Sequence, residues 1–202
     1  MFDMSSRLLR LFAGLVLFGV SLALMVRADV GLGPWDVFHQ GVAQRIGLSI
    51  GLVVNLTAIV VLLLWIPLRQ RPGIGTVANV VVVGLVTDGT LWLLPDLDAL
   101  TPRIALLVAG ILANAVATGL YVGAGLGPGP RDGLMTGLAA RGYSIRLVRT
   151  LIELTVLVIG ALLGGSVGVG TIAYALAIGP LVGVFLPRLT MAPRPVTNGE
   201  TA

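Results

Sequence analysis

The sequence has no cysteine, a single histidine and few charged residues, and each scarcity narrows the class of protein. Without cysteine the chain forms neither disulfides nor thiolate metal sites. Charged residues make up only 11% of the chain and hydrophobic residues 56%, and the mean hydropathy is +1.02. This composition is far from that of a soluble domain. A soluble ligand-binding module is therefore excluded.

The net charge of +4 does not indicate a nucleic-acid partner. Nucleic-acid binding needs basic residues gathered on one face, with aromatic rings for stacking. Here the arginines are scattered between apolar stretches, and aromatic residues make up only 5% of the chain. Orientation in a lipid bilayer explains these arginines better.

Long uncharged stretches predict helices that cross a bilayer, which takes roughly 20 residues each. The expected spans are 8–27, 48–67, 74–94, 103–123, 146–164 and 168–187. Two shorter helices, at about 34–46 and 130–142, are too short to span. We expect a single membrane domain over 1–202, with a disordered cytoplasmic tail at 189–202.

The chain repeats itself after about 95 residues. Gly31-Leu32-Gly33-Pro34, followed by Asp36, returns as Gly125-Leu126-Gly127-Pro128, followed by Asp132, and the segment 73–78 returns as 168–173. Repeat 1 covers about 8–95 and repeat 2 about 103–188, with three spans in each. Because three is odd, the second repeat must sit upside down relative to the first. The predicted fold class is an all-α membrane protein with six transmembrane helices in two inverted three-helix repeats, the construction of many secondary transporters.

The arginines predict the orientation of this arrangement. With both termini in the cytoplasm, ten arginines lie at cytoplasmic ends and three on the opposite side, namely Arg27, Arg45 and Arg103. This is a clear positive-inside bias.

A Gly/Pro break precedes each short helix, and we interpret these breaks as hinges. Their residues are Gly31, Gly33, Pro34, Gly125, Gly127 and Pro128. Either the short helices are re-entrant and form a pathway, or they lie at the membrane surface with Asp36 and Asp132 as caps. A helix start is positive and favours an anion, but each aspartate sits in that first turn.

The ionisable residues that differ between the repeats are further candidates for a substrate pathway. His39 follows Asp36 by three residues and lies on the same helix face, so the pair is suited to proton relay. The simpler alternative is a histidine at the membrane interface whose hydrogen bonds are satisfied. Arg149 and Glu153 are four apart in a predicted span, where ionisable residues face the interior by default. The alternative for this pair is a structural ion pair. With Arg131, which lies beside Asp132, the candidates for a substrate pathway are Asp36, His39, Arg131, Asp132, Arg149 and Glu153.

No catalytic triad, metal-ligand cluster or catalytic carboxylate pair can be assembled from the sequence. We therefore expect no enzymatic activity, no metal and no cofactor.

Several of these motifs resemble the YczE/YyaS/YitT family of small bacterial integral membrane proteins. The motifs are Gly31-Leu32-Gly33-Pro34-Trp35-Asp36-Val37, Gly127-Pro128-Gly129-Pro130-Arg131-Asp132-Gly133-Leu134-Met135, Gly164-Gly165-Ser166-Val167-Gly168-Val169-Gly170-Thr171 and Ile178-Gly179-Pro180-Leu181. The resemblance covers about residues 8–188 and implies a bacterial inner-membrane location, but it implies no mechanism.

The leading functional hypothesis is a small transporter or exporter of a small polar or anionic solute. The alternative is a non-transporting accessory or scaffold protein for another membrane or biosynthetic complex. Each half is small, so a homodimer is one way to enclose a pathway in the lipid bilayer.

Overall fold

The computed structural model describes residues 3–191, and all regular structure in this part of the chain is helical. The helices are α1 (Met4–Ala28), α2 (Pro34–Ile46), α3 (Ile50–Leu68), α4 (Ile74–Leu93), α5 (Leu100–Gly123), α6 (Pro130–Ala139), α7 (Ile145–Leu162) and α8 (Val169–Leu189). The six long and two short helices thus lie where the sequence predicts them. The expected tail at 189–202 lies outside the described residues from 192 onward, and Met191 donates a backbone hydrogen bond to Gly123.

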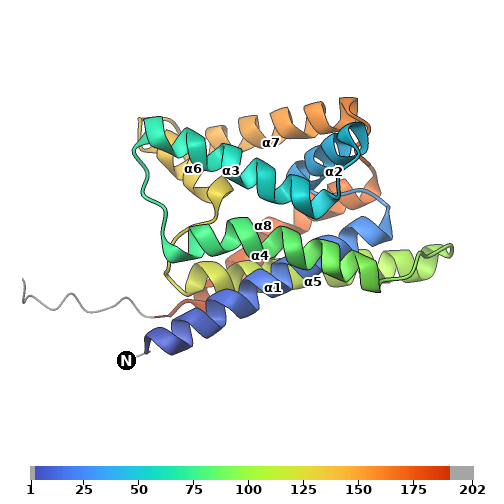
Figure 1. The fold of residues 1–202 in the computed structure, drawn as a ribbon, viewed down its shortest axis with the longest axis horizontal. Coiled ribbons are helices and arrows are strands. Elements are labelled where there is room, and N and C mark those ends of the chain that lie inside the picture. Colours follow the sequence, from blue (N-terminus) through green and yellow to red (C-terminus); the bar gives the residue numbers. More distant parts are fainter. Residues whose placement is uncertain (1–2, 192–202) are drawn as a thin grey trace, which may run out of the picture.

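The helices form two layers that run along the long axis of the molecule (Figure 1). One layer contains α1, α4, α5 and α8, and the other contains α2, α3, α6 and α7. Within the second layer, α2 packs on α7 and α3 packs on α6, so each short helix lies against a long helix of the other repeat. The two repeats are therefore interlocked rather than side by side.

Five helices are long and apolar enough to cross a membrane, namely α1, α3, α4, α5 and α8. The sixth long helix, α7, is not among them, because its 18 residues include Arg146, Arg149 and Glu153. The chain is thus a helical, multi-pass membrane protein.

The central helices α1 and α5 run antiparallel and are joined by two matching hydrogen bonds. The Arg7 guanidinium donates to the carbonyl of Ala124 at 2.9 Å, and that of Arg103 donates to the carbonyl of Ala28 at 2.7 Å. Each arginine begins one helix and binds the end of the other, where helix carbonyls lack partners. The two bonds are related by the same shift of 96 positions.

The Gly-rich breaks before α2 and α6 are also related by a shift of 96 positions. The matching tetrapeptides in the sequence are 94 positions apart. Gly31 has φ 113° and Gly127 has φ 121°, and the helices that follow begin at Pro34 and Pro130. The counterpart of Gly31 is therefore Gly127 rather than Gly125. Such φ values favour glycine.

Each break binds the start of a long helix in the other repeat. The amide of Gly75 donates to the carbonyl of Leu126, and the amide of Gly170 donates to that of Val30, both at 2.8 Å. A Cβ on Gly31 would lie 2.7 Å from the backbone nitrogen of Gly168, so this close contact requires glycine.

The repeats differ in how their last two helices pack. Gly84 of α4 lies against Gly51 of α3, and Asn55 binds the backbone of both Gly84 and Val81. Asp88 accepts hydrogen bonds from the Ser49 hydroxyl at 2.5 Å and the Gly51 amide at 2.8 Å, which caps α3. In contrast, α7 and α8 barely touch.

The face of α8 that corresponds to the packed face of α4 is open. Gly179 is the counterpart of Gly84, and apart from its chain neighbours and its own helix backbone no atom lies within 4 Å of where its Cβ would be. The same holds for Gly183, the counterpart of Asp88. One half of the molecule is thus closed at its last helix pair, and the other is open.

Candidate functional site

The starts of α2 and α6 meet inside the molecule. Asp36 lies in the first turn of α2 and Arg131 in the first turn of α6, and the carboxylate Oδ1 is 3.6 Å from the guanidinium Nη2. The same guanidinium lies over the ring of Trp35, 5.0 Å from its centroid, in a cation–π arrangement. This contact joins a charged group of each repeat.

Asp36 and His39 are buried, and their polar atoms are incompletely satisfied. His39 is 1% exposed, and its Nδ1 is 3.4 Å from Asp36 Oδ1. Neither ring nitrogen of His39 makes a hydrogen bond within the described part of the chain, nor does Asp36 Oδ1. Buried polar atoms are normally paired, because leaving one unpaired costs about 1–3 kcal/mol.

The second aspartate has its own partner and is exposed at the surface of the chain. The Tyr121 hydroxyl of α5 donates to Asp132 Oδ2 at 2.7 Å. Beside it, the Trp65 indole nitrogen of α3 donates to the carbonyl of Pro130 at 3.0 Å, which fixes the start of α6. Asp132 is exposed while Asp36 is buried, so the two equivalent carboxylates have different environments.

The Arg149–Glu153 pair lies near these residues and is partly exposed. Its Nε–Oε1 distance is 2.8 Å, and the side chains are 55% and 32% exposed. Tyr174 of α8 is close enough to interact electrostatically with Asp36 and Arg131 on one side and with both members of the pair on the other. A charged zone therefore extends from the contact of α2 and α6 to the side of α7 that α8 leaves uncovered.

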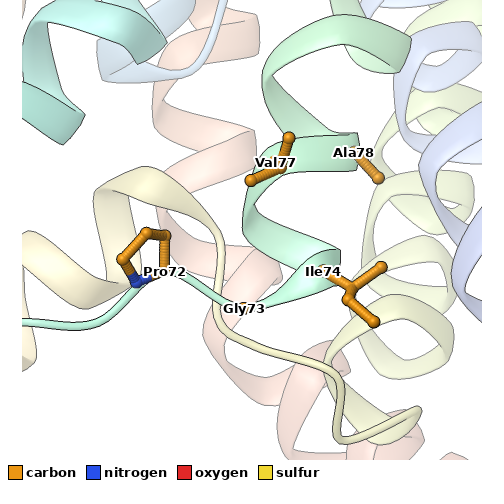
Figure 2. Close-up of a pocket in the computed structure, with 5 residues that line it drawn as sticks. All are labelled: Pro72, Gly73, Ile74, Val77 and Ala78. Atoms are coloured by element: carbon orange, nitrogen blue, oxygen red, sulfur yellow. The ribbon is translucent and has the colours of Figure 1, made fainter.

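Two surface hollows have linings that include none of these charged residues. One, of about 500 Å³, is lined by Pro72, Gly73, Ile74, Val77 and Ala78 at the start of α4 (Figure 2). Its lining is apolar, so it has no group with which to orient a polar solute.

The second hollow, of about 440 Å³, lies where α1 and α4 end and α5 begins. It contains two ion pairs, Arg27 with Asp96 and Arg103 with Asp29. Their acidic partners are largely exposed, so these pairs contribute little to stability.

All six pathway residues predicted from the sequence lie in the charged zone. They are Asp36, His39, Arg131, Asp132, Arg149 and Glu153. Sequence reasoning missed the aromatic residues around them, Trp35, Trp65, Tyr121 and Tyr174. A hydropathy pattern counts such residues as part of a span, and only the position of Trp35 between the break and Asp36 gave a signal.

The sequence of residues 5–187 matches the family of unknown function DUF6198. The chain belongs to this family. A relative in Haemophilus influenzae, described as an uncharacterized protein, is 40% identical over 184 residues, which cover 91% of this chain and 84% of the relative. The uncharacterized membrane protein YczE of Bacillus subtilis is 36% identical and covers 88% of this chain and 84% of its own length.

The family resemblance seen in the sequence motifs is confirmed by these matches. YyaS of Bacillus subtilis, also described as uncharacterized, is 24% identical over 181 residues and covers 86% of this chain and 89% of its own length. No solved structure matches the chain. Similarity to the membrane protein YczE, together with the apolar helices, indicates a bacterial membrane protein.

Proposed function

We propose that the protein transports a small polar solute through the interface of two inverted repeats. The observation that carries the proposal is the meeting of α2 and α6 at the Asp36–Arg131 contact. Irregular backbone at membrane depth is tolerated only where protein buries it or where it lines a wet cavity. Two broken segments that meet start to start are the arrangement around which many transporters bind solutes.

The inversion is supported by the antiparallel contact of α1 and α5 and by the matching breaks. In this proposal α7 is the sixth span, both termini are cytoplasmic, and α2 and α6 enter the membrane from opposite sides. The charges of α7 then face the interior rather than lipid, as ionisable residues in spans generally do.

The solute route runs from the cytoplasmic side along the uncovered side of α7. Arg149, Glu153 and Asp132 are at least partly exposed there, and the face of α8 at Gly179 is open. At the inner end of this route lie Asp36 and Arg131.

The charges favour a neutral, zwitterionic or cationic solute over an anion. A helix start attracts anions, but Asp36 and Asp132 already occupy the first turns of α2 and α6. The Arg149–Glu153 pair adds no net charge. Of the polar and anionic solutes expected from the sequence, the polar class is the one proposed here.

A thermal-shift screen of the purified protein against small polar solutes tests this function. A ligand at 100 times its Kd stabilises the folded state by about 2.7 kcal/mol. For a chain of this size that raises the Tm by roughly 5–10 °C. The same solute should then enter liposomes that contain the protein.

The variant Glu153→Gln should lose this stabilisation, whereas Asp98→Asn, which alters an exposed carboxylate outside the zone, should keep it. If no polar solute stabilises the protein and none crosses the liposome membrane, the protein is an accessory or scaffold rather than a transporter.

Labelling of single cysteines on either side of α7 tests the topology. The chain has no cysteine, so each introduced thiol is the only one present. Ser144→Cys, before α7, should react with an impermeant thiol reagent only from the cytoplasm, and Val167→Cys, after α7, only from outside. Both positions are exposed. Reaction of both from the same side would show that α7 does not cross the membrane.

A further inference from the structure

The His39 imidazole is buried beside a carboxylate with which it makes no hydrogen bond. A neutral imidazole has one N–H donor and one acceptor nitrogen, and in His39 both nitrogens are buried without a hydrogen bond in the described part of the chain. Protonation places a hydrogen on each nitrogen, so Nδ1 gains or keeps a donor directed at Asp36 Oδ1. The donor and acceptor are 3.4 Å apart, longer than a charge-assisted hydrogen bond of about 2.8 Å.

Asp36 Oδ1 has two basic neighbours on different repeats. His39 on its own helix is 3.4 Å away and Arg131 on α6 is 3.6 Å away, and neither makes a hydrogen bond to it. A small movement towards one neighbour completes that bond and lengthens the other. The carboxylate therefore has alternative partners within a repeat and across the two repeats.

The charged groups near the imidazole can be named for each packed element. Asp36 on α2 is 3.4 Å from the imidazole, and Arg131 on α6 is 3.6 Å from the same carboxylate oxygen. The neighbouring rings are Trp35 and Phe38, and α7 places Gly160 against the backbone of Phe38. On α8, Tyr174 acts on Asp36.

The remaining packed elements add little charge at the imidazole. Between its ends α3 has no charged residue. The charges of α7 are in the Arg149–Glu153 pair and in Arg146, and none of them is among the groups that act on His39.

We propose that Asp36 and His39 form a proton-binding site whose occupancy decides whether Asp36 pairs with His39 or with Arg131. The proton comes from water and is taken up by the imidazole, which becomes an imidazolium paired with Asp36. Arg131 is then released from the carboxylate and α6 is freed from α2. In the context of the proposed function, this site makes a proton the coupling ion. Proton binding itself needs no solute and is measured separately.

Because His39 is the only histidine, its titration can be followed directly by NMR. In protein labelled with ¹⁵N-histidine, the two imidazole nitrogens of the wild type should change together from neutral to imidazolium signals as the pH falls from 8.5 to 4.5. Asp36→Asn should move the midpoint down by about one pH unit, because the stabilising carboxylate is gone. Arg131→Gln should move it up by a similar amount.

Arg45→Gln is the matched control. It removes one arginine from α2, the helix of His39, at the end far from the imidazole, where Arg45 binds the carbonyl of Leu163. Its midpoint should stay at the wild-type value. An imidazole that does not titrate while the wild type stays folded would overturn the proposal. So would a midpoint that is unchanged in a folded Asp36→Asn variant.

The release of α6 has its own measurement. Thr136→Cys places a thiol on the exposed side of α6, and its labelling rate is divided by that of Ser144→Cys to remove the pH dependence of the thiol itself. The ratio should rise as the pH falls through the NMR midpoint, and this rise should be lost in His39→Gln. A ratio that does not change with pH, or that rises equally in His39→Gln, would show that proton binding does not control the contact between α2 and α6.

Discussion

Gly84→Ala is expected to destabilise the protein strongly, whereas Gly179→Ala at the equivalent position of the other repeat should have almost no effect. A Cβ on Gly84 would lie 2.1 Å from the carbonyl oxygen of Gly51 and 2.2 Å from Asn55 Oδ1. Both are far inside van der Waals contact, so α3 and α4 must separate. Overpacking of this kind costs about 2 kcal/mol, and the Tm of a chain of this size should fall by roughly 4–8 °C.

Gly179 is the matched control, because it has the same residue type, the same place in the repeat and open space where its Cβ would be. Thermal unfolding of the two variants in one detergent is the measurement. Equal destabilisation would mean that α7 covers α8 in the protein, contrary to the structure.

Arg131→Gln is expected to be the second costly substitution, because it leaves the Asp36 carboxylate buried without a cation. Removing one partner of a buried ion pair typically costs 3–5 kcal/mol. The Arg131 side chain is 27% exposed, so a loss of about 2 kcal/mol is expected here. Part of the loss also comes from the contact of Arg131 with Trp35.

A double-mutant cycle separates the ion pair from general damage to the fold. In Asp36→Asn with Arg131→Gln no charge remains unpaired, so the double variant should be more stable than the sum of the single losses predicts, by about 1 kcal/mol or more. Arg146→Gln, which removes an exposed arginine of α7, should change stability by less than about 0.5 kcal/mol. Strictly additive single losses would show that Asp36 and Arg131 do not interact.

The helices could be predicted from the sequence because their signals are local. Uncharged runs of spanning length, and proline after glycine at 33–34, place the elements within a few residues of their observed bounds. The candidate residues could be predicted for a related reason, since an ionisable residue within an apolar stretch is conspicuous.

The tertiary arrangement depends on contacts that the sequence does not display. The tetrapeptide that begins at Gly125 is identical to the one that begins at Gly31. The backbone conformation of Gly31, however, recurs at Gly127, because Gly127 has the similar φ and the same distance to the next helix. Pairing of Asp36 with Arg131 joins residues almost a hundred positions apart. Nothing in the local pattern predicted that α7 would leave α8 uncovered.

The unequal packing of the two repeats also suggests how such a molecule would change between its two transport conformations. Two halves of one architecture are seen in two conformations, closed at α3 and α4 and open at α7 and α8. In a transporter of this construction the opposite state follows if the halves exchange conformations, so that α7 closes on Gly179 and α3 leaves Gly84. The hydrogen bonds of Asp88 to the start of α3 would then act as the latch that holds the outer side shut, and its strength would set the rate at which that side opens.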